Sequence, residues 1–174
     1  MSTENWQNQA AETQHNSEGQ QYLSFVLDAE EYGIDILRVQ ELRGWTPVTP
    51  VPDMPEYIKG VLNLRGAIIP VVDLRKRFGL PERDYGPTTV VIVIKVDSGT
   101  KERVMGIIVD AVAETYTLTQ DQIQPPPQIG GGISSEFITG LVAQEEKMIV
   151  LMDIDELMNS DELAIDVPAL SNVK

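Results

Sequence analysis

The sequence predicts an all-β protein, because many short apolar runs are separated by turn residues and few segments have a helical pattern. This pattern fits barrels or a sandwich. An internal repeat favours two similar small barrels packed together, since one repeat is too short to bury a core of its own. The length of 174 residues suits one domain, or two small halves that share a core.

The strands can be followed in order along the chain. A polar segment over residues 1–19 predicts a disordered tail, and alternating residues from Leu23 to Leu27 predict the first strand. The prolines between Pro47 and Pro55 predict an extended loop, because proline fits neither a helix interior nor a central strand. Further strands are expected over 31–34, 39–43, 57–64, 67–74, 88–96, 104–109, 112–118 and 148–152.

Short helices and turns separate these strands. Residues 35–38 fit one helical turn, and Arg65-Gly66 is a hairpin signal between two apolar runs. Asp73 can cap a short helix, and either Asp153 or Asp155 can cap a terminal helix. Helix is therefore expected only in short segments.

The internal repeat has two registers. Residues 57–74 match residues 137–154 without gaps, 80 positions further along. The identical positions in the first copy are Ile58, Gly60, Ile69 and Asp73. Upstream, an offset of 73 positions sets Gly33-Ile34 on Gly106-Ile107. The repeat therefore covers most of the chain outside the two ends.

Composition excludes several functions. The 13 Lys and Arg residues against 27 Asp and Glu residues give a net charge of −14, which argues against binding nucleic acid or an anionic membrane surface. The chain has no cysteine and only one histidine, His15, so disulfides, thiol catalysis and multi-histidine sites are excluded. The longest apolar run, 90–94, is too short to span a membrane. Without a secretory signal, the expected location is the cytoplasm, with no direct membrane insertion.

Catalytic and metal-binding motifs are scarce. The glycine run 130–132 lacks the Lys-Ser/Thr that follows a phosphate-binding loop. Asp153, Asp155 and Glu156 lack the glycine and the spacing of a calcium-binding loop, and helix capping explains them better. We therefore predict no catalytic residue, no metal site and no cofactor.

Binding is the function that the remaining residues support. Ile36, Val39 and Leu42 recur at every third position, which fits either core residues or an apolar binding surface. Glu41 and Arg65 are either ordinary exposed charges or an ion pair at the edge of such a surface. The residues alone leave both alternatives open.

Four segments, 31–36, 39–44, 58–66 and 69–74, resemble the CheW family of bacterial chemotaxis coupling proteins. The most specific part is the Asn-Leu-Arg-Gly hairpin followed by Ile-Pro-Val-Val-Asp-Leu, and the resemblance runs from about residue 21 to 158. It implies two SH3-like five-stranded β-barrels that share a hydrophobic core. The implied domain covers residues 20–160, with a first barrel over about 23–88, a second over about 89–155 plus the N-terminal strand, and a C-terminal tail over 161–174.

The resemblance also implies a role without catalysis. Proteins of this family act as scaffolds that connect the cytoplasmic tip of a methyl-accepting chemoreceptor to the regulatory domain of the histidine kinase CheA. The implied receptor-binding residues are Ile36, Val39, Glu41, Leu42 and Arg65, and the implied kinase-binding residue is Ile68. The alternative function is a small β-barrel that binds a metabolite or uses paired carboxylates for hydrolysis.

Overall fold

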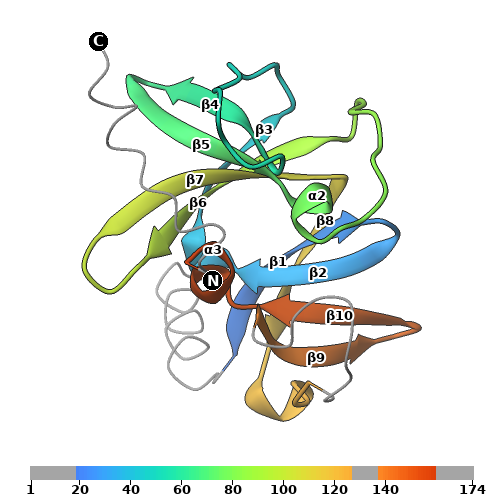
Figure 1. Cartoon of the computed structure of the whole chain (residues 1–174). Coiled ribbons are helices and arrows are strands. Elements are labelled where there is room, and N and C mark those ends of the chain that lie inside the picture. Colours follow the sequence, from blue (N-terminus) through green and yellow to red (C-terminus); the bar gives the residue numbers. More distant parts are fainter. Residues whose placement is uncertain (1–18, 127–136, 160–174) are drawn as a thin grey trace, which may run out of the picture.

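The computed structural model describes residues 19–126 and 137–159 of the chain. Within these residues, ten strands form two five-stranded sheets, and the helices are short (Figure 1). The predictions of a mainly β fold and of few helices are therefore confirmed. The glycine run 130–132 and the expected tails, apart from residue 19, lie outside the described residues.

The two sheets have the same internal arrangement. The first sheet has the order β8-β1-β2-β10-β9 and the second the order β3-β6-β7-β5-β4. The strands of the first sheet are β1 (Gln20–Leu27), β2 (Glu30–Asp35), β8 (Ala111–Leu118), β9 (Ile138–Gln144) and β10 (Lys147–Met152). Those of the second sheet are β3 (Val39–Gly44), β4 (Ile58–Leu64), β5 (Ala67–Asp73), β6 (Val90–Asp97) and β7 (Glu102–Val109).

Each repeat contributes strands to both sheets. The first repeat, β1 to β5, places its leading hairpin β1–β2 in the first sheet and its other three strands in the second. The second repeat, β6 to β10, does the reverse. The sheets therefore differ from the expected barrel bounds, because β2 joins the first sheet while β6 and β7 join the second. Each leading hairpin stays together through antiparallel pairing and crosses over as one unit.

The strand register confirms the repeat. In the second sheet, β5 and β7 pair in parallel with Val71 opposite Gly106, and in the first sheet β10 and β2 pair with Leu151 opposite Gly33. A Cβ atom on either glycine would lie 2.9 Å from a neighbouring side-chain carbon, so any larger residue there would force its neighbour to move. Equivalent residues thus occupy equivalent places in the two sheets.

The capping residues also repeat. Asp73 accepts N–H groups of Arg75 and Lys76 at the start of α2 (Leu74–Arg77), and Asp153 caps α3 (Ile154–Met158) in the same way. Of the two aspartates considered for the terminal helix, Asp153 is therefore the cap. Two 3₁₀ turns, η1 (Ile36–Arg38) and η2 (Gln120–Gln122), complete the described elements.

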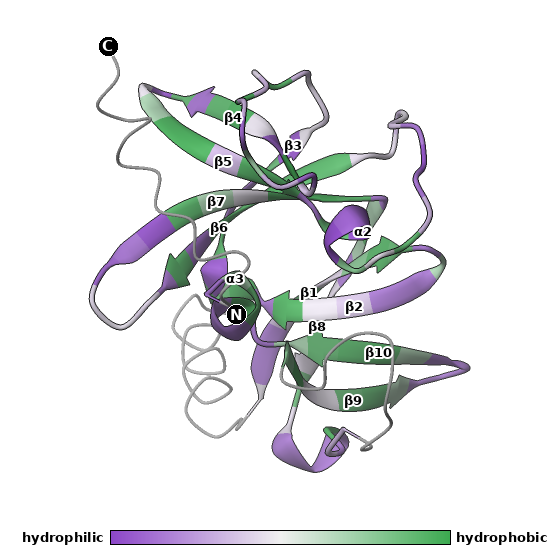
Figure 2. Ribbon diagram, viewed as in Figure 1, coloured by the Kyte–Doolittle hydropathy of each residue, from purple (hydrophilic) through white to green (hydrophobic). Residues whose placement is uncertain are grey.

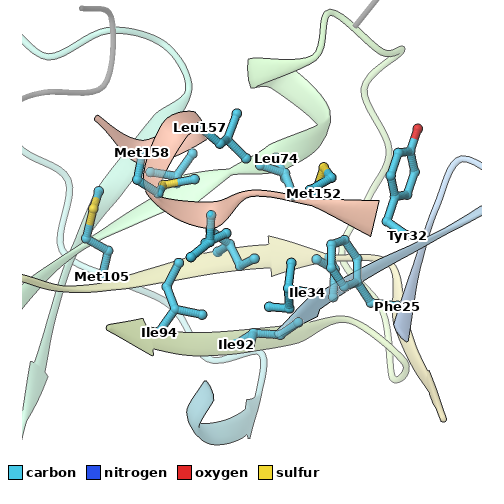
Figure 3. Close-up of a cluster of buried hydrophobic side chains, with 14 of the residues drawn as sticks. Phe25, Tyr32, Ile34, Leu74, Ile92, Ile94, Met105, Met152, Leu157 and Met158 are labelled. Carbon is cyan, nitrogen blue, oxygen red and sulfur yellow. The ribbon is translucent and has the colours of Figure 1, made fainter. Parts of the chain in front are cut away.

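A single large core lies between the two sheets. Its fully buried members come from both sheets and from α2 and α3, and Figure 3 shows their side chains packed against one another. They include Phe25, Ile34, Leu74, Ile92, Ile107 and Leu157. A smaller apolar cluster lies within each sheet. Figure 2 shows that hydrophilic residues gather on α2 and at the free end of the β6–β7 hairpin. The predicted shared core is confirmed.

The hydrogen-bonded order leaves β3 and β4 as the edges of the second sheet, and β8 and β9 as the edges of the first. One isolated antiparallel bridge, Thr49 with Val61, connects the chain beyond β3 to β4. The corresponding bridge in the first sheet joins Gln124, beyond β8, to Leu141 in β9. Each sheet therefore has one isolated bridge between its two edges, at equivalent places in the two sheets. None of the helices in the described ranges is long and apolar enough to cross a membrane.

Candidate binding site

The segment from η1 to β3 crosses from the first sheet to the second. The Asp35 carboxylate accepts the Leu37 N–H at 2.9 Å and so caps the 3₁₀ turn. The chain then enters β3, an edge strand that pairs with β6 and shifts register between Val39 and Glu41. A bulge at this position bends an edge strand and re-aims its side chains. The segment is therefore exposed on one side and anchored on the other.

The three apolar residues predicted here do not share one environment. Ile36 and Val39 are half-buried and pack against the shared core, whereas Leu42 is 46% exposed. The most exposed large apolar side chain in the described part of the chain is Leu37, at 79%. Sequence reasoning missed Leu37. The sequence does contain a signal for it. Leu37 directly follows Ile36, the first residue of a single capped turn, and in such a turn only one of two adjacent apolar residues can face the core.

The charged residues come together as an ion pair. Arg65 occupies the β4–β5 turn with a φ of 51° and donates to Glu41 on β3, with an Nη2–Oε1 distance of 2.5 Å. Arg43 lies 3.2 Å from the other carboxylate oxygen. Hydrogen bonds from Arg65 and then Arg43 hold the pKa of Glu41 below its ordinary value of 4.5. The predicted pair therefore exists, and it connects edge strand β3 to the turn that follows edge strand β4.

Ile68 lies close to this pair along the chain. It is the second residue of β5, it is half-buried, and its neighbour across the hairpin is Asn63. Residues further along β5 are buried, so Ile68 marks the point at which the strand leaves the core. Its environment fits a surface contact better than a core role.

The first sheet has a different charge arrangement at the equivalent edge. Glu114 on β8 matches Glu41 in the repeat, and its carboxylate lies 3.8 Å from Lys147 on β10. Lys147 also lies 3.2 Å from Glu31, which is 8% exposed. The edge glutamate is thus kept in both repeats, but arginines contact it only in the second sheet among the described residues, one on each carboxylate oxygen.

Two cavities differ in their distance from the η1–β3 edge, because one lies away from it and the other lies beside η1. The first, about 350 Å³, lies beneath the loop 81–89 and is lined by Arg75 and Asp110 among others. The second, about 260 Å³, lies beside η1 and α3 and is lined by Arg38 and Asp155 among others. In the described ranges, no group of three or more His, Cys, Asp or Glu side chains is placed to hold a metal ion.

Comparison with known proteins gives one consistent result. The family model described as a CheW-like domain matches residues 21–162. The chain is 46% identical to the chemotaxis protein CheW of Klebsiella aerogenes over 147 residues, covering 84% of this chain and 86% of that protein. It is 39% identical to the CheW of Rhizobium meliloti over 144 residues, covering 83% and 90%.

A solved structure agrees with this assignment. The crystal structure of the scaffolding protein TtCheW from Thermoanaerobacter tengcongensis matches with a TM-score of 0.73 and 33% identity. The match covers 83% of this chain and 95% of that one. Because the sequence matches and the fold span nearly all of the described residues, the chain belongs to the CheW family.

Proposed function

We propose that this protein holds a chemoreceptor tip and the histidine kinase CheA on two separate surfaces of one rigid unit. As a member of the CheW family, the chain is a non-enzymatic adaptor of chemotaxis signalling that couples receptors to this kinase. This family role gives no support to the hydrolytic alternative considered from the sequence. The proposal concerns which residues bind each partner, and it places the protein in the cytoplasm beside the receptors.

The receptor surface is formed by η1, β3 and the β4–β5 turn. Leu37 and Leu42 are the exposed apolar residues of this segment, and Ile36 and Val39 connect it to the core. A helical partner docks through apolar side chains into an apolar surface with a polar rim. The Glu41–Arg65 ion pair supplies that rim, and its Nη2–Oε1 distance of 2.5 Å is the observation that carries the proposal.

The kinase surface includes Ile68 at the start of β5. Its half-buried side chain offers apolar area that a partner domain can cover without unfolding the sheet. We further propose that each five-stranded sheet is a small SH3-like barrel. The two bridges at the open edges support this, since each joins the strands at opposite ends of one sheet order. Barrel closure would make both surfaces stiff, which lowers the entropic cost of binding.

The test measures two affinities for each variant, one for a receptor-tip fragment and one for the kinase regulatory domain. Leu42→Glu is expected to weaken receptor binding tenfold or more, because burying a leucine contributes about 1.5–3 kcal/mol. Arg65→Ala is expected to act in the same direction while the melting temperature changes by only a few degrees, because exposed pairs contribute about 0–1 kcal/mol to stability. Ile68→Glu is expected to weaken kinase binding and spare receptor binding.

Controls separate binding from folding. Met148→Glu changes an equally exposed apolar residue, at 50%, on β10 of the other sheet, and receptor affinity should not change. Val39→Asp is less informative than Leu42→Glu, because Val39 packs on the core and a buried carboxylate destabilises the fold. Equal losses of both affinities in Leu42→Glu would reject the receptor surface, and an unfolded Ile68→Glu protein would reject the kinase surface.

A further inference from the structure

An ion pair connects the receptor-binding segment to the C-terminal helix. Arg38, the last residue of η1, donates from Nη1 to Asp155 Oδ1 at 3.0 Å and from Nη2 to Oδ2 at 2.5 Å. Such a two-pronged contact fixes the plane of the guanidinium as well as its position. The side chains are 30% and 26% exposed, so solvent reaches the pair without surrounding it.

Asp155 also holds the end of a neighbouring strand. Its Oδ1 atom accepts the Asp97 N–H at 2.7 Å, at the end of β6. The Asp97 carbonyl in turn accepts the Asn159 side-chain amide at 2.8 Å. Because β6 is the partner of β3, one carboxylate contacts both the turn that begins the binding segment and the strand that supports it.

The equivalent place in the other repeat contains a similar connection with opposite charges. Arg75 is the second residue of α2, as Asp155 is of α3, and it lies 80 positions earlier. Its guanidinium donates to Asp110 at 2.6 Å, and Asp110 connects β7 to β8 as η1 connects β2 to β3. Each helix therefore binds the segment by which the chain crosses between sheets.

We infer that Asp155 is a positioning residue for the receptor-binding segment. Through Arg38 it sets the orientation of η1, and so of the exposed Leu37 and the first residues of β3. This inference rests on the proposed receptor surface. Asp155 lies in a different element from the receptor-contacting residues, on α3, so its effect on the receptor is exerted through Arg38.

The first test needs no partner. Hydrogen exchange of the Leu37 and Val39 amides reports on η1, because these N–H groups are bonded to Asp35 and to the Ile36 carbonyl. In Asp155→Asn the side chain keeps an oxygen for the Asp97 N–H but loses its charge. Exchange at both amides should become about fivefold faster, as expected when a charge-assisted contact weakens. Unchanged exchange would overturn the inference.

The second test is a double-mutant cycle on receptor affinity. Asp155→Asn and Arg38→Gln should each weaken receptor binding about fivefold, and the double variant should be no weaker than the single ones, because all three lose the same contact. Kinase affinity should stay unchanged. Additive losses would show that Arg38 acts independently of Asp155 and would overturn the inference.

Glu156→Gln is the matched control. It removes the same charge one residue along α3, where the side chain is exposed, and should leave both exchange and affinity unchanged. If the wild-type protein itself fails to bind the receptor tip, the proposed function fails, while the exchange measurement still decides the role of Asp155. A loss of melting temperature together with equal losses of both affinities would show a purely structural role and would contradict the inference.

Discussion

The two repeats of this protein share a backbone plan but differ in their charges. Both place an aspartate at the start of the helix, a glycine opposite the parallel strand and a glutamate on the edge strand. At the second helical residue, however, one repeat has Arg75 and the other Asp155. The same backbone geometry is therefore found with a positive or a negative charge on the helix. In both repeats the helix contacts the segment by which the chain crosses between the sheets.

Burial distinguishes the two contacts more than polarity does. The Arg75 side chain is 7% exposed and is shared by Asp110, Asp28 and the Pro81 carbonyl. The Arg38 side chain is about four times more exposed, at 30%, and its partner Asp155 is 26% exposed against 15% for Asp110. A buried pair is costly to break because one charge is left without water or a partner, whereas an exposed pair can re-solvate. The Arg75–Asp110 contact is therefore expected to persist in the folded protein, whereas the Arg38–Asp155 contact can open and re-form.

The largest expected effect comes from breaking the buried connection. Arg75→Ala should lower the free energy of unfolding by about 3–5 kcal/mol, because Asp110 is left without its main partner. Arg38→Ala should lower it by about 1 kcal/mol or less. Urea denaturation of both variants measures the difference. Equal losses would mean that the two connections are energetically equivalent and that the comparison does not hold.

A second comparison uses the paired glycines Gly60 and Gly140. A Cβ on Gly60 would lie 2.3 Å from the Thr49 carbonyl oxygen, which belongs to a backbone bridge and cannot move freely. At Gly140 the nearest atom is the Cγ2 methyl of the Ile123 side chain, at 2.3 Å, and the Gln124 backbone oxygen lies at 3.0 Å. Gly60→Ala should therefore cost about 1–3 kcal/mol and Gly140→Ala less. Thermal unfolding of the two variants tests this order, and a larger loss at Gly140 would reverse it.

The smallest expected effect concerns Tyr85, whose hydroxyl donates a hydrogen bond to the capping aspartate Asp73. Burial, followed by a hydrogen bond to Asp73 at 2.5 Å, raises the pKa of Tyr85 above its ordinary value of 10.0. The folded chain therefore holds this proton more tightly than the unfolded chain does. Its contribution to stability is complete below about pH 10 and is lost as the pH rises toward the folded pKa.

Tyr85→Phe should cost about 1 kcal/mol at neutral pH through the lost hydrogen bond. Above about pH 10 the variant should lose stability less steeply than the wild-type protein. Chemical denaturation at neutral pH and in the alkaline range measures both effects. Parallel curves for the two proteins would show that the raised pKa of Tyr85 contributes nothing to the alkaline loss.

Local signals account for what the sequence predicted correctly. The structure confirms the Arg65-Gly66 turn and the Asp73 cap, which depend on residues that are neighbours in the sequence. It also confirms the register of the repeat, which depends on residues that recur at a constant offset. The Glu41–Arg65 pair could also be proposed from the sequence, because the two residues lie in or beside apolar runs that follow one another along the chain. Their roles in binding stay predictions.

The features that the sequence did not predict depend on contacts between distant parts of the chain. Nothing near β2 in the sequence indicates that its parallel partner is β10, so the exchange of hairpins between repeats could not be read from local pattern. Leu37 and Ile36 are both apolar, and only the direction of the 3₁₀ turn decides which one faces solvent. The Arg75–Asp110 contact likewise depends on the crossing of two separate segments.

The exchange of hairpins has a consequence for synthesis of the chain. Glu31 in β2 pairs with Ile149 in β10, so the first hairpin to leave the ribosome needs one of the last strands as its neighbour. At about 5–20 residues per second, the nascent hairpin waits on the order of ten seconds with its apolar face uncovered. The first sheet therefore is complete only when translation is nearly finished. While the hairpin waits for β10, its uncovered apolar residues are a surface that chaperones can bind.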